Sequence, residues 1–285
     1  MPQTTPIQIS VINASTVVSD AEVQPVVDAL QQQVTHDFGP VWGVDAALTF
    51  VPGNSTPPSN TWWLSILDDS DQAGALGYHD LTPEGLPLGK VFAGTDLKYG
   101  SIWSVTASHE LLEMLGDPNI NLTVLVQPQN VQPQNAQPQS TQTAGTLYAY
   151  ELCDACEDDS FAYTISGVKV SDFVYPSWFE DFRAENSTQF DQQKRITKPF
   201  QLLTGGYIGV FDVNSGTGWH QITDEILNKK KPTSMKQRGT VGSRRERRRI
   251  PRYQWITSRT HREIQTNAKK YRERVMELRA ERAAA

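Results

Sequence analysis

The sequence predicts an α+β fold, in which a mixed sheet packs against one buried helix and a basic helical extension follows. Short segments with alternating apolar and polar residues are typical of strands, and two longer segments repeat their apolar residues at helical spacing. The charge then changes sign. Residues 1–228 hold seven Lys/Arg and 27 Asp/Glu, whereas residues 229–285 hold 19 and five. The chain therefore divides into an acidic body of charge −20 and a basic tail of charge +14.

The first part of the body alternates strands with one early helix. Ser19-Asp20 offers an N-cap, and apolar residues from Val23 to Val34 follow helical spacing until Gly39-Pro40, where we expect the helix to end. Strands are predicted, in order, at residues 7–13, 46–51, 61–67, 75–79 and 90–93.

A second helix and the remaining strands complete the body. The helix is predicted from about Ser101 to Leu115, with Gly116 as its C-terminal cap and Asp117-Pro118 blocking continuation. Further strands are predicted at residues 146–153, at 161–165 and 168–174 as a hairpin, and at 205–212.

A low-complexity segment interrupts the body at residues 124–145. Its centre repeats five residues three times, as Val-Gln-Pro-Gln-Asn, Val-Gln-Pro-Gln-Asn and Ala-Gln-Pro-Gln-Ser. Segments so rich in Gln and Pro bury too little apolar surface to offset the entropy of ordering the chain. We therefore expect a flexible surface insertion within a domain that spans residues 1–228.

Composition excludes several classes of protein. Hydrophobic residues make up 38% of the chain, which is enough to bury a core. No apolar run approaches the length that a transmembrane helix needs, and the N-terminus lacks the pattern of a signal peptide, so a cytoplasmic location is expected. Two cysteines, Cys153 and Cys156, exclude a disulfide-dense scaffold and a four-cysteine zinc site within one chain.

The segment that carries chemistry is Ser108-His-Glu-Leu-Leu-Glu-Met-Leu-Gly-Asp-Pro118. On a helix, His109, Glu110 and Glu113 fall in one sector about 100° wide, and apolar side chains occupy most of the remainder. This stripe is either the solvated face of an amphipathic helix or a functional site. One imidazole and two carboxylates, with no Lys, Arg, Gln or Asn among them, form a set typical of metal ligands.

This pattern resembles the zincin metallopeptidases, whose signature is His-Glu-x-x-His on a helix. The resemblance covers roughly residues 7–118 and implies that His109 is a zinc ligand and Glu110 the general base. Glu113 stands where that family has its second His. A carboxylate can bind zinc, but it reduces the net charge of the metal site and shifts the preference towards manganese or iron. The chain is also similar to uncharacterised bacterial proteins with Ser-His-Glu-x-x-Glu-Met and Tyr-Glu-x-Cys-Asp segments.

A third metal ligand is expected from the acidic cluster that follows the insertion. Glu151 and Asp154 are the preferred candidates, and the sequence does not separate them; a solvated acidic turn is the alternative for this cluster. Cys153 and Cys156 are read as buried or loosely paired thiols, with a mixed site that includes His109 as the other possibility. Tyr148, Tyr150 and Tyr163 are candidates for donating a hydrogen bond to an oxyanion, and His79 for lining the cleft; packing is the alternative role for all four.

The basic tail, residues 229–285, predicts an amphipathic helix and an anionic partner. An apolar seam with alternating spacings of four and three residues runs through Ile264, Ala268, Tyr271, Val275 and Leu278. The Lys and Arg side chains would attract a nucleic acid, an anionic surface, an acidic protein or the chain's own acidic body.

The sequence therefore predicts a metal-dependent hydrolase. The expected form is a zinc metallopeptidase in which His109, Glu113 and either Glu151 or Asp154 hold the metal, with manganese or iron as possible replacements. Glu110 would act as general base on a metal-activated water, and the substrate would be a peptide or protein. The alternative is a catalytically inactive zincin-like binding or structural protein, whose basic tail contacts nucleic acid or another anionic partner.

Overall fold

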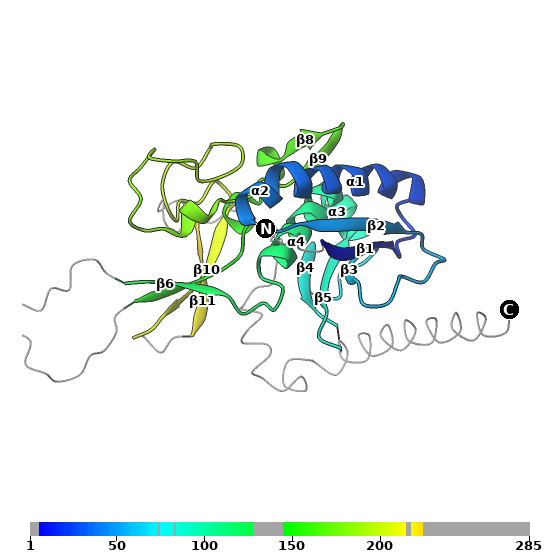
Figure 1. Ribbon diagram of the computed structural model, residues 1–285, viewed down its shortest axis with the longest axis horizontal. Helices are drawn as coiled ribbons and strands as arrows, with labels where there is room; N and C mark the ends of the chain where they lie inside the picture. Colours follow the sequence, from blue (N-terminus) through cyan, green and yellow to red (C-terminus); the bar gives the residue numbers. More distant parts are fainter. Residues whose placement is uncertain (1–5, 73–74, 83, 128–144, 215–217, 225–285) are drawn as a thin grey trace, which may run out of the picture.

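The described residues form an α+β fold with three separate sheets, of five, four and two strands (Figure 1). The computed structural model describes residues 6–72, 75–82, 84–127, 145–214 and 218–224. The predicted basic tail and most of the Gln/Pro insertion lie outside these residues. Within the described part of the chain, no helix has the length and hydropathy needed to cross a membrane.

The first sheet has five strands in the order β2-β1-β3-β5-β4, and all five were predicted. β2, β1, β3 and β5 run parallel to one another, whereas β4 pairs antiparallel with β5 at the edge of the sheet. The sheet is therefore mixed, as expected. Its strands are β1 (Ile7–Asn13), β2 (Ala46–Val51), β3 (Trp62–Leu67), β4 (Gly77–Leu81) and β5 (Pro87–Phe92).

The first helix begins as predicted but continues past the predicted end. α1 (Asp20–Gln32) leads into a π-helical segment, η1 (Gln33–Phe38), and then into α2 (Gly39–Trp42). Pro40 does not break the helix because it lies in the first turn of α2, where a missing N–H costs no hydrogen bond. The helical chain ends instead at Gly43, whose φ of 68° is the left-handed conformation that glycine adopts readily.

The second long helix is the central element of the body. α4 (Trp103–Gly116) follows a short helix that the sequence analysis missed, α3 (Ala93–Tyr99). α4 packs against β3, β4 and β5 on one side and against β9 on another, so every residue from Ser104 to Leu115 is buried. Gly116 is its last residue, and Asp117 rather than Gly116 is the cap.

A hairpin covers α4 and α1. β8 (Tyr163–Ile165) and β9 (Val168–Val170) pair antiparallel, as predicted, around Ser166 and Gly167, which have positive φ angles of 49° and 86°. β9 contacts both α1 and α4. The segments that flank the hairpin include three short 3-10 helices, η2 (Asp154–Cys156), η3 (Asp159–Phe161) and η4 (Pro176–Phe179).

The second sheet has four antiparallel strands in the order β11-β10-β7-β6. They are β6 (Thr123–Val126), β7 (Thr146–Ala149), β10 (Tyr207–Asp212) and β11 (Trp219–Thr223). β6 and β11 were not predicted, and residues 124–126, assigned to the insertion, belong to strand β6. β7 ends at Ala149, four residues before the predicted end at Cys153, because the chain then turns inward towards α4.

Candidate metal centre

The polar stripe of α4 is completely buried. His109, Glu110 and Glu113 each expose 0% of their surface. The interpretation of this stripe as a solvated face is therefore wrong. Burying one imidazole and two carboxylates is costly unless each group has a compensating partner, so the surroundings of this stripe decide what it can do.

His109 lies between two carboxylates. Its Nε2 atom is 3.2 Å from Oε1 of Glu113, one helical turn further along α4, and 3.3 Å from Oδ1 of Asp154 in η2. Its Nδ1 atom has no hydrogen-bond partner among the described residues. One nitrogen lone pair therefore faces two oxygen donors from separate elements, which is an arrangement that a small cation can occupy.

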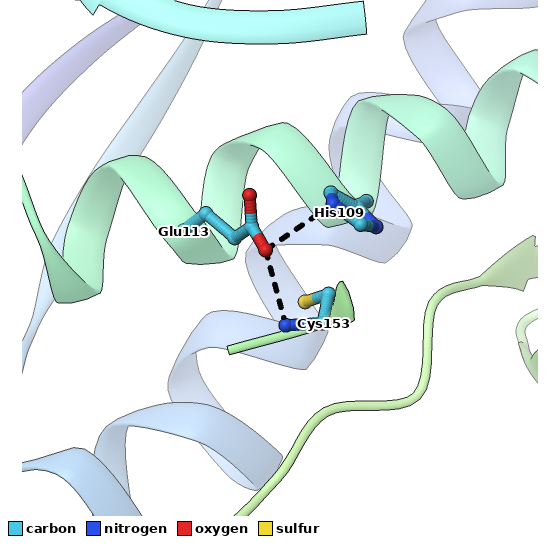
Figure 2. Close-up of side chains that lie close together, drawn as sticks. All are labelled: His109, Glu113 and Cys153. Atoms are coloured by element: carbon cyan, nitrogen blue, oxygen red, sulfur yellow. Dashed lines mark hydrogen bonds and ion pairs between the residues drawn. The ribbon is translucent and has the colours of Figure 1, made fainter. Parts of the chain in front are cut away.

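Close packing at Gly116 brings the segment after β7 to α4. A Cβ atom at Gly116 would lie 2.2 Å from Cδ1 of Leu152, so a larger residue would push this segment away. The backbone N–H of Cys153 donates a hydrogen bond to Oε1 of Glu113 over 3.2 Å (Figure 2). This contact fixes the Glu113 carboxylate and places Asp154, the next residue, beside His109.

The two candidates for the third ligand lie beside different histidines. Asp154 is 5% exposed and contacts His109, whereas Oε2 of Glu151 lies 3.9 Å from Nε2 of His79. The acidic cluster is therefore not a solvated turn as a whole. Asp154 and Glu157 are buried, Glu151 and Asp159 are partly buried, and Asp158 is exposed.

His79 reaches the same centre from the edge strand β4. It is 0% exposed, and its Nδ1 atom lies 3.6 Å from Oε2 of Glu110 and 3.6 Å from Oε2 of Glu113. Gly77 explains this approach, because a Cβ atom there would lie 2.7 Å from Cγ2 of Thr106 and 2.8 Å from Cγ of Glu110. Residues 77 and 79 share one face of the strand, so His79 meets α4 one turn further along.

The charges of the centre are strongly coupled. Burial lowers the pKa of His109, but the carboxylates of Glu113, Asp154 and Glu110 outweigh burial, and the pKa is raised well above its usual value. Burial and the charge of Glu113 raise the pKa of Asp154 to about 7, against the opposing effect of His109. Without a metal, these shifts favour a proton on the His109 imidazole, and a metal ion would have to displace it.

The donor atoms fall into three overlapping groups, within each of which they lie less than 4.8 Å apart: His109–Glu113–Cys153, His79–Glu110–Glu113 and His109–Asp154–Glu157. Nitrogen, carboxylate oxygen and a thiol are all zinc ligands. A surplus of carboxylates suits manganese or iron as well. The chemistry of the donor set therefore fits a divalent transition metal.

The two cysteines are free and buried, as one sequence interpretation had it. Burial, followed by the charge of Glu113 for Cys153 and of Asp172 for Cys156, raises both thiol pKa values well above the usual value. Neither thiol is therefore activated as a nucleophile. Figure 2 shows the Cys153 side chain beside His109 and Glu113, which keeps the alternative of a mixed site that includes His109 open.

Ser108, beside His109, and the three candidate tyrosines make contacts that hold the fold together. The Ser108 hydroxyl donates to Gln33 and accepts from the backbone of Ser171, so it joins η1, α4 and the segment after β9. Tyr163 donates to Asp37. Tyr148 and Tyr150 pack on the rings of Phe200 and Phe179.

Tyr207 is the tyrosine that the sequence analysis missed. It is buried on β10, and its hydroxyl donates a hydrogen bond to Asp154. Burial and the neighbouring carboxylates raise the pKa of Tyr207, so the hydroxyl remains a donor at neutral pH. Tyr207 follows Gly205-Gly206 at the start of a predicted strand, but nothing local links it to Asp154, which is 53 residues away in the chain.

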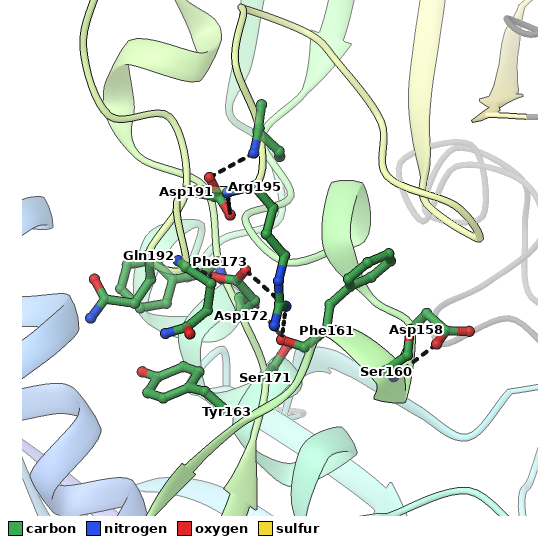
Figure 3. Close-up of polar contacts among 12 residues, drawn as sticks. Asp158, Ser160, Phe161, Tyr163, Ser171, Asp172, Phe173, Asp191, Gln192 and Arg195 are labelled. Atoms are coloured by element: carbon green, nitrogen blue, oxygen red, sulfur yellow. Dashed lines mark hydrogen bonds and ion pairs between the residues drawn. The ribbon is translucent and has the colours of Figure 1, made fainter. Parts of the chain in front are cut away.

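A second buried acidic pair, Asp172 and Asp191, contributes no residue to these donor groups (Figure 3). Asp191 accepts hydrogen bonds from the backbone N–H groups of Arg195 and Ile196. Asp172 accepts from those of Phe173 and Gln193, and the Arg195 guanidinium is 3.8 Å away. Burial and Asp191 raise the pKa of Asp172 to about 8. This pair organises loops through backbone donors.

Comparisons with protein-family models, with curated proteins and with solved structures found no match.

Proposed function

We propose that the protein is a metal-dependent hydrolase that acts on peptide bonds and uses zinc. The observation that carries the proposal is the position of His109, whose Nε2 atom faces carboxylate oxygens of Glu113 and Asp154 at 3.2 and 3.3 Å in a fully buried site. These three residues would hold the ion. Glu151, the other sequence candidate, would stand at its margin beside His79.

Two of the three proposed ligands, both carboxylates, are held by a further contact. The Cys153 N–H fixes Glu113, and the Tyr207 hydroxyl fixes Asp154. Such outer contacts orient metal ligands and typically change metal affinity ten- to a hundredfold when removed. These two contacts support the proposal that the carboxylate ligands are preformed.

Glu110 is the proposed general base. When bound, the metal supplies a Lewis acid that acidifies a water molecule and polarises the substrate carbonyl. The Glu110 carboxylate would accept the proton of the attacking water and pass it to the leaving amine. Glu110 lies on α4 directly after His109, and it follows the order of the zincin signature, which supports this role.

A peptide substrate fits the arrangement of the sheet. β4 is the edge strand next to α4, and it carries His79 towards the centre. Extended peptides commonly bind by adding to a strand at a sheet edge. The edge of β4 would then place a scissile bond beside the proposed metal ligands. Manganese or iron remain replacements for zinc in this proposal, because carboxylates dominate the donor set.

The test combines metal content with hydrolysis. Purified full-length protein should contain one or more zinc ions by elemental analysis and should cleave denatured casein. The variant His109→Ala should lose the ion held by His109 and lose cleavage, and Glu110→Gln should retain at least one ion and lose cleavage by at least a hundredfold. His220→Ala, at an exposed position on β11, is the matched control. A protein that binds no divalent metal at neutral pH contradicts the proposal.

A second candidate function is a non-catalytic metal centre in a binding protein. The observation that favours it is the complete burial of His109, Glu110 and Glu113, because a hydrolase must admit its substrate. Glu151, with 16% of its side chain exposed, is more accessible than Asp154, with 7%. Under this alternative, Glu110→Gln changes no activity, and deletion of the basic tail, which lies outside the described residues, abolishes salt-sensitive binding to nucleic acid.

A further inference from the structure

We propose that His79, Glu110 and Glu113 form a second divalent-cation site, and that a cation bound there inhibits the hydrolase by occupying Glu110. The inhibitory effect rests on the proposed function, whereas the cation site itself does not. This site uses the donor group His79–Glu110–Glu113, whose ligand atoms all lie within 4.8 Å of one another.

The position of the Glu113 carboxylate between two imidazoles is the observation that carries the inference. Its two carboxylate oxygens face two different imidazoles: Oε1 lies 3.2 Å from Nε2 of His109, and Oε2 lies 3.6 Å from Nδ1 of His79. A carboxylate in this position can bind one cation through each oxygen. Carboxylates of this kind hold the paired metal ions of many two-metal sites, which lie about 3.5–4 Å apart.

The remaining ligands of the second site come from both sides of Glu113. Oε2 of Glu110 lies 3.6 Å from the same His79 Nδ1 atom, on the neighbouring turn of α4. Oε2 of Glu151 lies 3.9 Å from the other nitrogen of His79. An imidazole nitrogen and two carboxylate oxygens form three protein ligands, which is the number that leaves open positions on a divalent ion.

Two glycines bring the strands of this site close to α4. Gly77 lets β4 approach Thr106 and Glu110. The residue paired with His79 on β5 is Gly89, and the space that its side chain would fill is bordered by Leu64 and Glu110. Two glycines therefore flank His79, one along its own strand and one across the ladder. Any larger residue at position 77 would separate the imidazole from both carboxylates.

Charge supports two cations rather than one. Glu110, Glu113, Glu151 and Asp154 each lie within 4 Å of His79 or His109. When ionised, four carboxylates carry a charge of −4, and one divalent ion compensates half of it. Because uncompensated charge in a buried site is expensive, the second cation would make the fully ionised cluster far more stable.

Occupation of the second site has a direct chemical consequence. A general base needs a lone pair with which to accept a proton. When the Glu110 carboxylate binds a cation, that lone pair is engaged and the basicity of the group falls. The one-ion protein would then be the active form, and excess metal would inhibit it reversibly.

The first test counts ions. Full-length protein, treated with EDTA and titrated with Zn²⁺ in a calorimeter, should bind two ions, the second more weakly. His79→Ala should bind one, and the exposed control His220→Ala should bind two. The rate of casein cleavage by the wild-type protein should fall at least tenfold when Zn²⁺ is raised from one equivalent to a large excess. In His79→Ala, the cleavage rates at these two Zn²⁺ concentrations should differ by less than twofold.

A measurement on the wild-type protein alone guards against misfolding of the variant. Two Mn²⁺ ions that share Glu113 should give a spin-coupled electron paramagnetic resonance spectrum, whereas a single ion gives the isolated six-line pattern. One bound ion with hydrolysis overturns the second site and leaves the proposed function intact. Two coupled ions without hydrolysis support the site and contradict the function. Absence of any bound ion overturns both.

Discussion

The two buried acidic clusters of this protein contain similar residues but compensate them in different ways. Asp172 and Asp191 receive four backbone N–H groups from neighbouring loops, together with the Arg195 guanidinium. The carboxylates around α4 face imidazoles instead, and Glu113 alone is 3.2 Å from one and 3.6 Å from another.

The difference teaches how to separate structural acids from functional ones. Backbone donors are fixed by the fold, so a carboxylate that they satisfy serves mainly to hold a loop. Imidazole nitrogens have lone pairs of their own, and lone pairs that converge with carboxylate oxygens require a proton or a metal between them. The Asp172–Asp191 pair therefore acts on the fold, and the His109 cluster is the candidate for chemistry.

Metal addition should produce the largest effect that distinguishes the clusters. Zn²⁺ at a thousand times its Kd should stabilise the protein by about 4 kcal/mol, because it binds the folded chain and not the unfolded chain. This corresponds to a rise in Tm of about 10 °C by differential scanning fluorimetry. The rise should vanish in His109→Ala and persist in Asp191→Asn. If Zn²⁺ raised the Tm of His109→Ala as much as that of the wild-type protein, the cluster around His109 would not be the metal site.

Asp191→Ala should produce the largest loss of stability without affecting metal binding. It leaves the backbone N–H groups of Arg195 and Ile196 without their acceptor, at a cost of about 3 kcal/mol. Urea unfolding in EDTA measures this loss, and zinc calorimetry should give an unchanged Kd. If zinc affinity fell as well, the two clusters would form one energetic unit.

Gly116→Ala should damage the metal centre through packing alone. The added methyl group meets Leu152, displaces the segment that carries Asp154 and costs about 1–3 kcal/mol. Zinc affinity should fall with stability. In a double-mutant cycle with Leu152→Ala, the two effects should sum to more than the loss in the double variant, because the smaller side chain relieves the clash. Strict additivity would contradict the packing explanation.

Asp172→Asn should act mainly on the pH dependence of the stability. The Asp172 pKa is about 8 in the folded protein against an ordinary value of 3.8. The folded state therefore holds the proton more tightly, and this group's contribution to stability declines as pH rises from about 4 to about 8. Asn removes that decline while it keeps the oxygen acceptor. Urea unfolding between pH 5 and pH 9 should show a flatter profile for the variant.

Local pattern was sufficient to predict most elements of the body. The alternation in residues 7–13 and the apolar helix that ends near Gly116 both match observed elements, because burial of one strand face or nearly a whole helix is visible over a few residues. The prediction failed where context overrode local signals. Pro40 suggested a helix end, yet it starts a further helical turn.

The sequence named candidates beyond α4, but it fixed the relative positions of the site residues only along this helix. His109, Glu110 and Glu113 share one helix, so their spacing fixes their proximity. Asp154, and not Glu151, lies beside His109 because Gly116 packs closely on Leu152. The position of His79 depends in the same way on Gly77. Both are contacts between segments far apart in the chain, and a single sequence contains no local signal for them.

The β6–β7 hairpin has a consequence for how this chain tolerates change. Its ladder runs from the pair Thr123–Ala149, next to the segment that carries Asp154, to the pair Val126–Thr146 (Figure 1). In the sequence, the Gln/Pro repeats lie between Val126 and Thr146, at the end of the ladder away from Asp154. We therefore expect a change in the number of repeats to leave the pairing of β6 with β7 unchanged, and a fluorescent or affinity tag inserted there to be tolerated.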